Sequence, residues 1–123
     1  EDYINTYKTA VLSTANIMKY SEKSLIAGTK EIATTSVINI SSMYGMVSHD
    51  FSIYRSTQMF NSPYYGSSKA ALMQYTKYAA VYYAKKKIRV NSVSLGPIPN
   101  VKMSKISRKF QDYSIFFRFF QKI

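Results

Sequence analysis

Cysteine is absent from the sequence, and there are only one histidine and four glycines. Without cysteine the chain forms no disulfide and no catalytic thiolate, and we expect a cytoplasmic location. Because His49 is the single histidine, no cluster of histidines and carboxylates has metal-ligand spacing, and we expect no metal site. No apolar run of about 18 residues and no signal-peptide pattern is present, so we expect no membrane segment.

Acidic residues are also scarce, because six Asp and Glu against seventeen Lys and Arg give a formal net charge of +11. Such a charge can mark binding to nucleic acid or to an anionic surface, since phosphate contacts release counterions. The densest basic run, residues 85–87 with Arg89, falls where a helix should end, and cations there complement the helix dipole. We therefore favour a structural role over a basic binding patch, and expect no nucleic-acid partner.

Hydrophobic residues make up 46% of the chain, which is typical of one globular domain. Their pattern predicts a helix over 3–27, a strand over 37–40, a helix over 62–85 and a strand over 88–94. We expect Gly28 to end the first helix and Pro63 to begin the second. Because a long helix joins the strands, they should be parallel, which predicts an α/β fold.

Tyr65 and Lys69 lie one turn apart on the same face of the second predicted helix. An unperturbed phenol has a pKa of about 10, and a neighbouring ammonium lowers such a pKa toward the range of efficient acid-base catalysis. Tyr65 is therefore a candidate general acid, and Lys69 is the residue that would lower its pKa. Because the chain has twelve tyrosines, this spacing also arises by chance, and the flanking segments decide between the two interpretations.

Three segments in order carry a resemblance: SVINISS (36–42), YYGSSKAAL (64–72) and KIRVNSV (87–93). Together they resemble the second half of the short-chain dehydrogenase/reductase family, over roughly residues 5–101. The resemblance implies that Ser42 hydrogen-bonds a substrate carbonyl or hydroxyl and that Tyr65 passes the proton. It also implies that Lys69 holds the nicotinamide ribose of NAD or NADP and lowers the pKa of Tyr65.

Further residues come from the same resemblance. An Asn on the preceding helix usually completes a proton relay through water, and we assign this role to Asn16, with Asn5 as the alternative. The segment Gly96, Pro97 and Ile98 is implied to contact the cofactor. The implied substrate is a small carbonyl or alcohol, and complete relatives form homo-oligomers through the equivalent of the second helix.

Two departures from the family pattern limit this reading. The spacing from Ser42 to Tyr65 is longer than usual, and the added loop resembles one in a subgroup linked to bacterial surface-sugar and flagellin-glycan pathways. We interpret residues 45–63 as a lid or substrate-side loop. The sequence also contains no Gly-rich turn to cradle a cofactor pyrophosphate.

We therefore expect a partial Rossmann-like fold that holds the catalytic half of the family domain. Residues 1–101 would form this half, and residues 102–123 would form a divergent basic and aromatic helical tail. The predicted function is that of an NAD(P)-dependent oxidoreductase. The alternative is an inactive fragment or a basic interaction module derived from such an enzyme.

Overall fold

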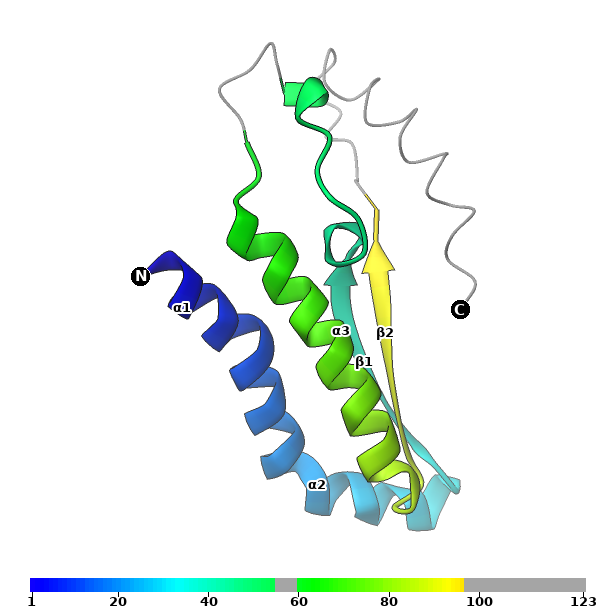
Figure 1. Ribbon diagram of the computed structural model, residues 1–123. Helices are drawn as coiled ribbons and strands as arrows, with labels where there is room; N and C mark the ends of the chain where they lie inside the picture. Colours follow the sequence, from blue (N-terminus) through cyan, green and yellow to red (C-terminus); the bar gives the residue numbers. More distant parts are fainter. Residues whose placement is uncertain (55–59, 97–123) are drawn as a thin grey trace, which may run out of the picture.

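The computed structural model describes residues 1–54 and 60–96 (Figure 1). The elements run in the order α1 (Asp2–Tyr7), π-helical turn η1 (Lys8–Leu12), α2 (Ser13–Ile32), β1 (Thr35–Ser42), 3₁₀ turns η2 (Met43–Gly45) and η3 (Phe51–Tyr54), α3 (Pro63–Ala84) and β2 (Ile88–Leu95). The two helices and two strands predicted between residues 3 and 94 are thus all present. Pro97, Ile98 and the predicted tail at 102–123 lie outside the described residues, as does part of the inserted loop.

The first helix is longer than predicted, and its predicted end at Gly28 is wrong. α2 continues to Ile32 and stops at Ala33, whose φ of 63° is left-handed. A Cβ at Gly28 would lie 2.8 Å from Cγ2 of Thr35, the first residue of β1. Gly28 therefore serves close packing between α2 and the strand, and the helix continues through it.

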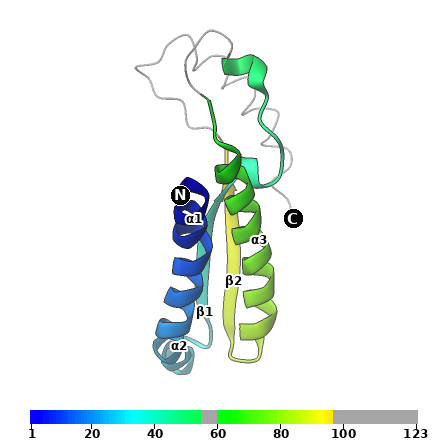
Figure 2. The ribbon, with the colours of Figure 1, turned by 60° about the vertical axis from the view of Figure 1, so that its left-hand side comes forward.

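β1 and β2 pair in parallel, as predicted, in a register that runs from Thr35 opposite Ile88 to Ser42 opposite Leu95. Figures 1 and 2 show α2 and α3 on the same side of this two-stranded sheet. The buried core lies between the helices and the strands and consists of Met18, Ala79, Tyr83, Ile88 and Val90.

The opposite face of the sheet is open among the described residues. Its alternate side chains remain exposed, with Ile38 at 58%, Ile40 at 52% and Val93 at 39% of their full area. Parallel sheets are normally covered on both faces, so the described part of the chain forms one helical layer and part of a sheet. This agrees with the predicted partial α/β fold.

Polar contacts fix α3 against β1. Asn39 Nδ2 donates to Thr76 Oγ1 at 2.9 Å, and Thr76 Oγ1 donates in turn to the Leu72 carbonyl at 2.8 Å. Nearer the start of α3, Ser41 Oγ donates to the Lys69 carbonyl at 3.1 Å. These contacts set the height of α3 along the strand, and with it the position of the residues on its first two turns.

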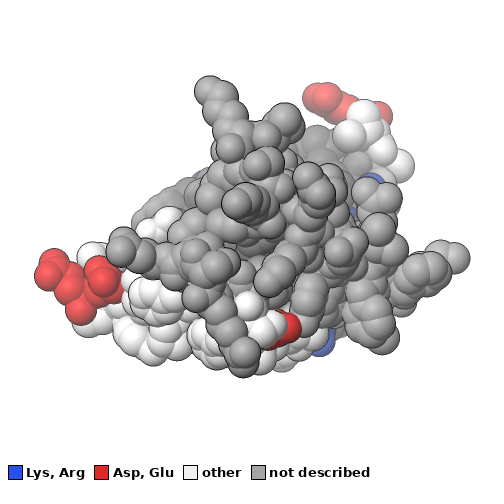
Figure 3. All heavy atoms as spheres, turned by 90° about the horizontal axis from the view of Figure 1, so that it is seen from above, with Lys and Arg blue, Asp and Glu red and all other residues white. Residues whose placement is uncertain are grey.

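The basic run after α3 has a structural role at its central residue. Lys86 Nζ lies 2.5 Å from Glu22 Oε1 on α2 and 4.7 Å from the Tyr82 ring centroid. In Figure 3, where grey atoms cover much of the face, acidic and basic side chains of the coloured residues show only in small, separate areas. No basic patch gathers on this face among the coloured residues.

Within residues 1–54 and 60–96, no helix combines the length and apolar character that a membrane span requires. The same part of the chain holds no group of three or more His, Cys, Asp or Glu side chains placed to bind a metal ion.

Candidate active site

A cavity of about 400 Å³ lies where the two parallel strands end. Four of the predicted site residues line it: Ser42 at the end of β1, Tyr65 and Lys69 on the first two turns of α3, and Gly96 just after β2. In open α/β sheets, ligands bind at this carboxyl edge of the strands. The fold therefore brings together residues that are as far as 54 positions apart in the sequence.

Lys69 is held by the end of β1. Its Nζ donates to the Ile40 carbonyl at 3.0 Å and lies 5.8 Å from the centroid of the Tyr65 ring. An ammonium has three N–H donors, and this is the single hydrogen bond that Nζ makes to the described residues. The lysine is thus positioned by backbone while it keeps donors for a ligand.

Ser42 is buried, with 6% of its area exposed, and ends β1 in an extended conformation. Its Oγ accepts a hydrogen bond from the Tyr44 N–H at 3.2 Å, so the serine caps the 3₁₀ turn η2. A serine hydroxyl that accepts through a lone pair still has its proton to donate. The geometry therefore leaves Ser42 able to donate to an oxygen in the cavity.

The structure does not place every predicted residue in this cavity. Asn16 is exposed on α2 and Asn5 is exposed on α1, and neither lines the cavity. Pro97 and Ile98 lie outside the described residues. The roles given to these four residues remain predictions.

Tyr44 and Asn61 also line the cavity, and the sequence reasoning missed both. They come from the η2 turn and from the segment before α3, which have no hydrophobic period to reveal them. One signal was present at Gly66, where a Cβ would lie 2.7 Å from the Tyr44 carbonyl oxygen. The glycine of the YGSSK segment thus permits the close approach that places Tyr44 beside α3.

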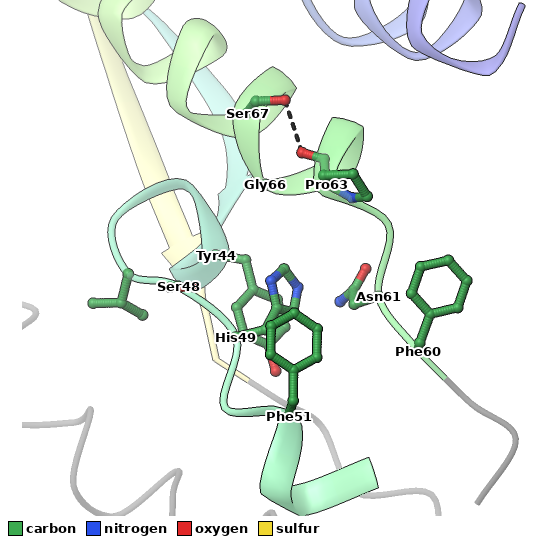
Figure 4. A pocket seen from close by; sticks show the side chains of 10 residues that line it. Tyr44, Ser48, His49, Phe51, Phe60, Asn61, Pro63, Gly66 and Ser67 are labelled. Carbon is green, nitrogen blue, oxygen red and sulfur yellow. Dashed lines mark hydrogen bonds between the residues drawn. The ribbon is translucent and has the colours of Figure 1, made fainter. Parts of the chain in front are cut away.

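A second cavity, of about 380 Å³, lies beneath the start of α3 (Figure 4). Figure 4 shows the His49 ring overlapping Tyr44 and Phe51, with Asn61 pointing toward the imidazole. The His49 and Tyr44 rings stack, with centroids 3.7 Å apart and planes 22° apart. Desolvation lowers the pKa of His49, and a hydrogen bond between the imidazole and the Asn61 side chain opposes this shift.

The family model described as "Enoyl-(Acyl carrier protein) reductase" matches residues 1–116 of the chain. No curated protein matches the chain.

Solved structures similar to the chain include a short chain dehydrogenase from Leptospira borgpetersenii with bound NAD+, at 26% identity and a TM-score of 0.68. A short-chain dehydrogenase/reductase family oxidoreductase from Brucella ovis, in complex with a partially ordered NAD, is 26% identical with a TM-score of 0.60. A variant of ElxO with NADPH bound is 29% identical, also with a TM-score of 0.60.

The alignments cover 90%, 90% and 89% of this chain, respectively, but only 40%, 43% and 39% of the three solved chains. The chain therefore spans about two fifths of the length of the structures it matches.

Proposed function

Because the chain belongs to the short-chain dehydrogenase/reductase family, we propose that its cavity at the sheet edge is the reactive part of an NAD(P)-dependent oxidoreductase site. The substrate would be a small carbonyl compound or alcohol. The observation that carries this proposal is that Ser42, Tyr65, Lys69 and Gly96 all line one cavity at the carboxyl ends of β1 and β2.

Each side chain has a task that its environment supports. Ser42 donates its hydroxyl proton to the substrate oxygen and so orients the reacting carbon. Tyr65 gives its phenolic proton to the same oxygen during reduction and takes it back during oxidation. Lys69 holds its positive charge near the Tyr65 ring and stabilises the phenolate that remains after the proton has left.

The residues present fit the nicotinamide end of a cofactor. A bound nicotinamide supplies the hydride for reduction or accepts it for oxidation. Lys69 would hold the adjacent ribose through the donors that the Ile40 carbonyl leaves free, and Gly96 would lie against the ring. Similar structures hold NAD+ or NADPH, and both cofactors are consistent with these residues.

We extend the proposal to the location, metal content and oligomeric state of the protein. The protein would act in the cytoplasm, possess no metal, and form homo-oligomers through exposed helical surface such as Tyr78, Val81 and Tyr82 on α3. Its long loop supports a link to the surface-sugar and flagellin-glycan subgroup. Tyr65 would be joined to solvent through Asn16 and ordered water.

Turnover by matched tyrosine variants tests the proposal. NADH or NADPH oxidation is followed with a panel of aldehydes and ketones for the unmodified chain, Tyr65→Phe and Tyr64→Phe. Removal of the Tyr65 hydroxyl should lower kcat by about 10²- to 10⁴-fold, the usual contribution of a general acid. Tyr64 does not line the cavity and packs edge-on against Tyr3, so Tyr64→Phe should keep the rate.

Equal rates for Tyr65→Phe and the unmodified chain would overturn the assigned role. The second candidate is a chain that is inactive by itself, and the coverage of only about two fifths of the matched structures favours it. Absence of turnover with every carbonyl, in a folded chain, would select this candidate.

A further inference from the structure

The cavity beneath α3 has an unusual lining for a surface loop, because four of its ten lining residues carry aromatic rings. Tyr44, His49, Phe51 and Phe60 contribute rings, and Pro63 and Gly66 at the start of α3 complete the wall (Figure 4). At about 380 Å³ its volume lies within the range of small-molecule sites. It is therefore large enough to hold a ring.

Two of these aromatic side chains are exposed and do not belong to a core. Phe51 has 63% and Phe60 has 69% of its area accessible, although both border a hollow. Exposed apolar side chains that gather around a concave surface mark ligand-binding grooves. The loop thus presents apolar surface that a bound ligand would cover.

The cavity adjoins the candidate active site. Tyr44 and Asn61 line both cavities, so a molecule whose reacting oxygen lies near Ser42 and Tyr65 has the aromatic cavity directly beside it. Tyr44 is fixed between the two, because its backbone N–H donates to Ser42 Oγ and its ring stacks on His49. The two cavities can therefore serve two ends of one substrate.

The lining of the aromatic cavity also restricts the chemistry of the substrate end that it can bind. No Lys, Arg, Asp or Glu is among its described lining residues. A phosphate or carboxylate placed here would be desolvated without a charged side chain to pair with, which costs free energy. A flat apolar ring is stabilised there instead by offset or edge-on contact with the aromatic side chains.

We propose that the aromatic cavity binds an uncharged aromatic group of the substrate, next to the carbonyl or alcohol carbon that reacts at Tyr65. This assignment of substrate class rests on the proposed function. It predicts that aryl ketones and the corresponding alcohols bind better than small aliphatic ones.

The single histidine of the chain allows a direct test. The full chain is titrated with acetophenone, and the imidazole Cε1 proton of His49 is followed by NMR. Acetone serves as the matched ketone without a ring. We expect a saturable shift with acetophenone, a much smaller one with acetone, and binding about three- to tenfold weaker in Phe51→Leu.

The variant Tyr20→Leu is the control, because Tyr20 is an exposed aromatic side chain on α2 outside the cavity. It should leave acetophenone affinity unchanged. A shift with D-glucose larger than that with acetophenone would overturn the aromatic assignment, as would equal affinity in Phe51→Leu and the unmodified chain.

A parallel NADH titration separates this inference from the proposed function. If NADH binds and acetophenone does not move the His49 signal, the inference is overturned while the proposed function stands. If acetophenone moves the signal and neither NADH nor NADPH binds, the aromatic cavity is supported and the proposed function fails.

Discussion

At the scale of single residues, the site depends on close approaches between the η2 turn and the start of α3. A Cβ on Gly45 would lie 2.9 Å from backbone atoms of Lys69 and Ala70, and one on Gly66 would lie 2.7 Å from the Tyr44 carbonyl. Backbone cannot move aside as a flexible side chain can. Both glycines therefore permit the close approach between the η2 turn and the start of α3.

Gly66→Ala tests this close packing. The clash with the Tyr44 carbonyl should cost about 1–3 kcal/mol, and the better helix propensity of Ala should return about 1 kcal/mol or less. We expect a net loss of about 1–2 kcal/mol in the free energy of unfolding, measured by urea denaturation.

Gly96→Ala is the matched control, since a Cβ there meets no atom within 4 Å. Its stability should equal that of the unmodified chain. Equal stability of Gly66→Ala would contradict the view that the η2 turn and α3 are packed backbone against backbone.

The sequence allowed prediction of site residues on regular elements and of Gly96 just after β2, and it missed Tyr44 and Asn61 on irregular segments. Ser42, Tyr65 and Lys69 could be placed because a strand end and a helical repeat set their positions. Tyr44 and Asn61 come from segments whose course depends on tertiary contacts such as the stack with His49. Local pattern carries no signal for such contacts.

At the scale of elements, the buried Asn39–Thr76 hydrogen bond sets how α3 lies on β1. Thr76→Val keeps the side-chain shape and leaves the Asn39 amide without its partner, which should cost about 1–3 kcal/mol of stability. Asn39→Ala and the double variant complete a cycle, read by urea unfolding, with an expected coupling of about 0.5–3 kcal/mol.

Thr14→Val is the control for this cycle. Thr14 Oγ1 donates to the Ala10 carbonyl within its own helix, as Thr76 does to Leu72, but the structure gives it no partner on another described element. We expect a change within about 0.5 kcal/mol. A coupling of zero between Asn39 and Thr76 would refute the positioning role of their contact.

The packing of α3 against α2 also makes stability depend on pH. Burial raises the pKa of Tyr83 above its ordinary 10.0, Glu22 adds to this shift, and Lys86 opposes it. The unfolded chain therefore loses the Tyr83 proton at a lower pH than the folded chain does. The contribution of Tyr83 to stability is complete below about pH 10 and is lost as the pH rises through the pKa of the folded state. The hydrogen bond to Glu22 raises the pKa of Lys86, whose contribution is lost in the same direction.

Tyr83→Phe should reduce this alkaline loss, because it keeps the ring and removes the titrating hydroxyl. The measurement is the urea midpoint at about pH 8 and about pH 11 for the unmodified chain, Tyr83→Phe and Tyr20→Phe. Tyr20 is 79% exposed and is not among the groups that shift the pKa of Tyr83, so its variant should behave like the unmodified chain. Identical pH dependence in all three would rule out Tyr83 as a source of the loss.

Element boundaries show where sequence patterns succeed. Pro63 begins α3 as predicted, because proline needs no N–H partner in the first helical turn. Gly28 was wrongly predicted to end α2, because a glycine required by contact with Thr35 looks the same in sequence as one required by a left-handed turn. Packing against another element decides between these two uses.

At the scale of the whole molecule, the open face of the sheet is the dominant feature of the described residues. Exposed Ile38 and Val93 on that face should promote self-association. The double variant Ile38→Thr/Val93→Thr keeps β-branched side chains and should shift sedimentation velocity profiles toward the monomer.

Ile17→Thr provides the comparison, because Ile17 is 66% exposed on α2. A similar shift with Ile17→Thr and none with the double variant would show that the open sheet face adds nothing to the association proposed for α3, contrary to this prediction.

The central claim is that the cavity at the sheet edge binds the nicotinamide end of a cofactor through Lys69. Titration of the chain with NADH and NADPH, followed by cofactor fluorescence, tests it most directly. We predict saturable binding, weakened about ten- to a hundredfold by Lys69→Ala and unchanged by Lys77→Ala, which removes an exposed lysine of the same helix. No binding up to millimolar cofactor, or equal binding by Lys69→Ala and the unmodified chain, would contradict the claim.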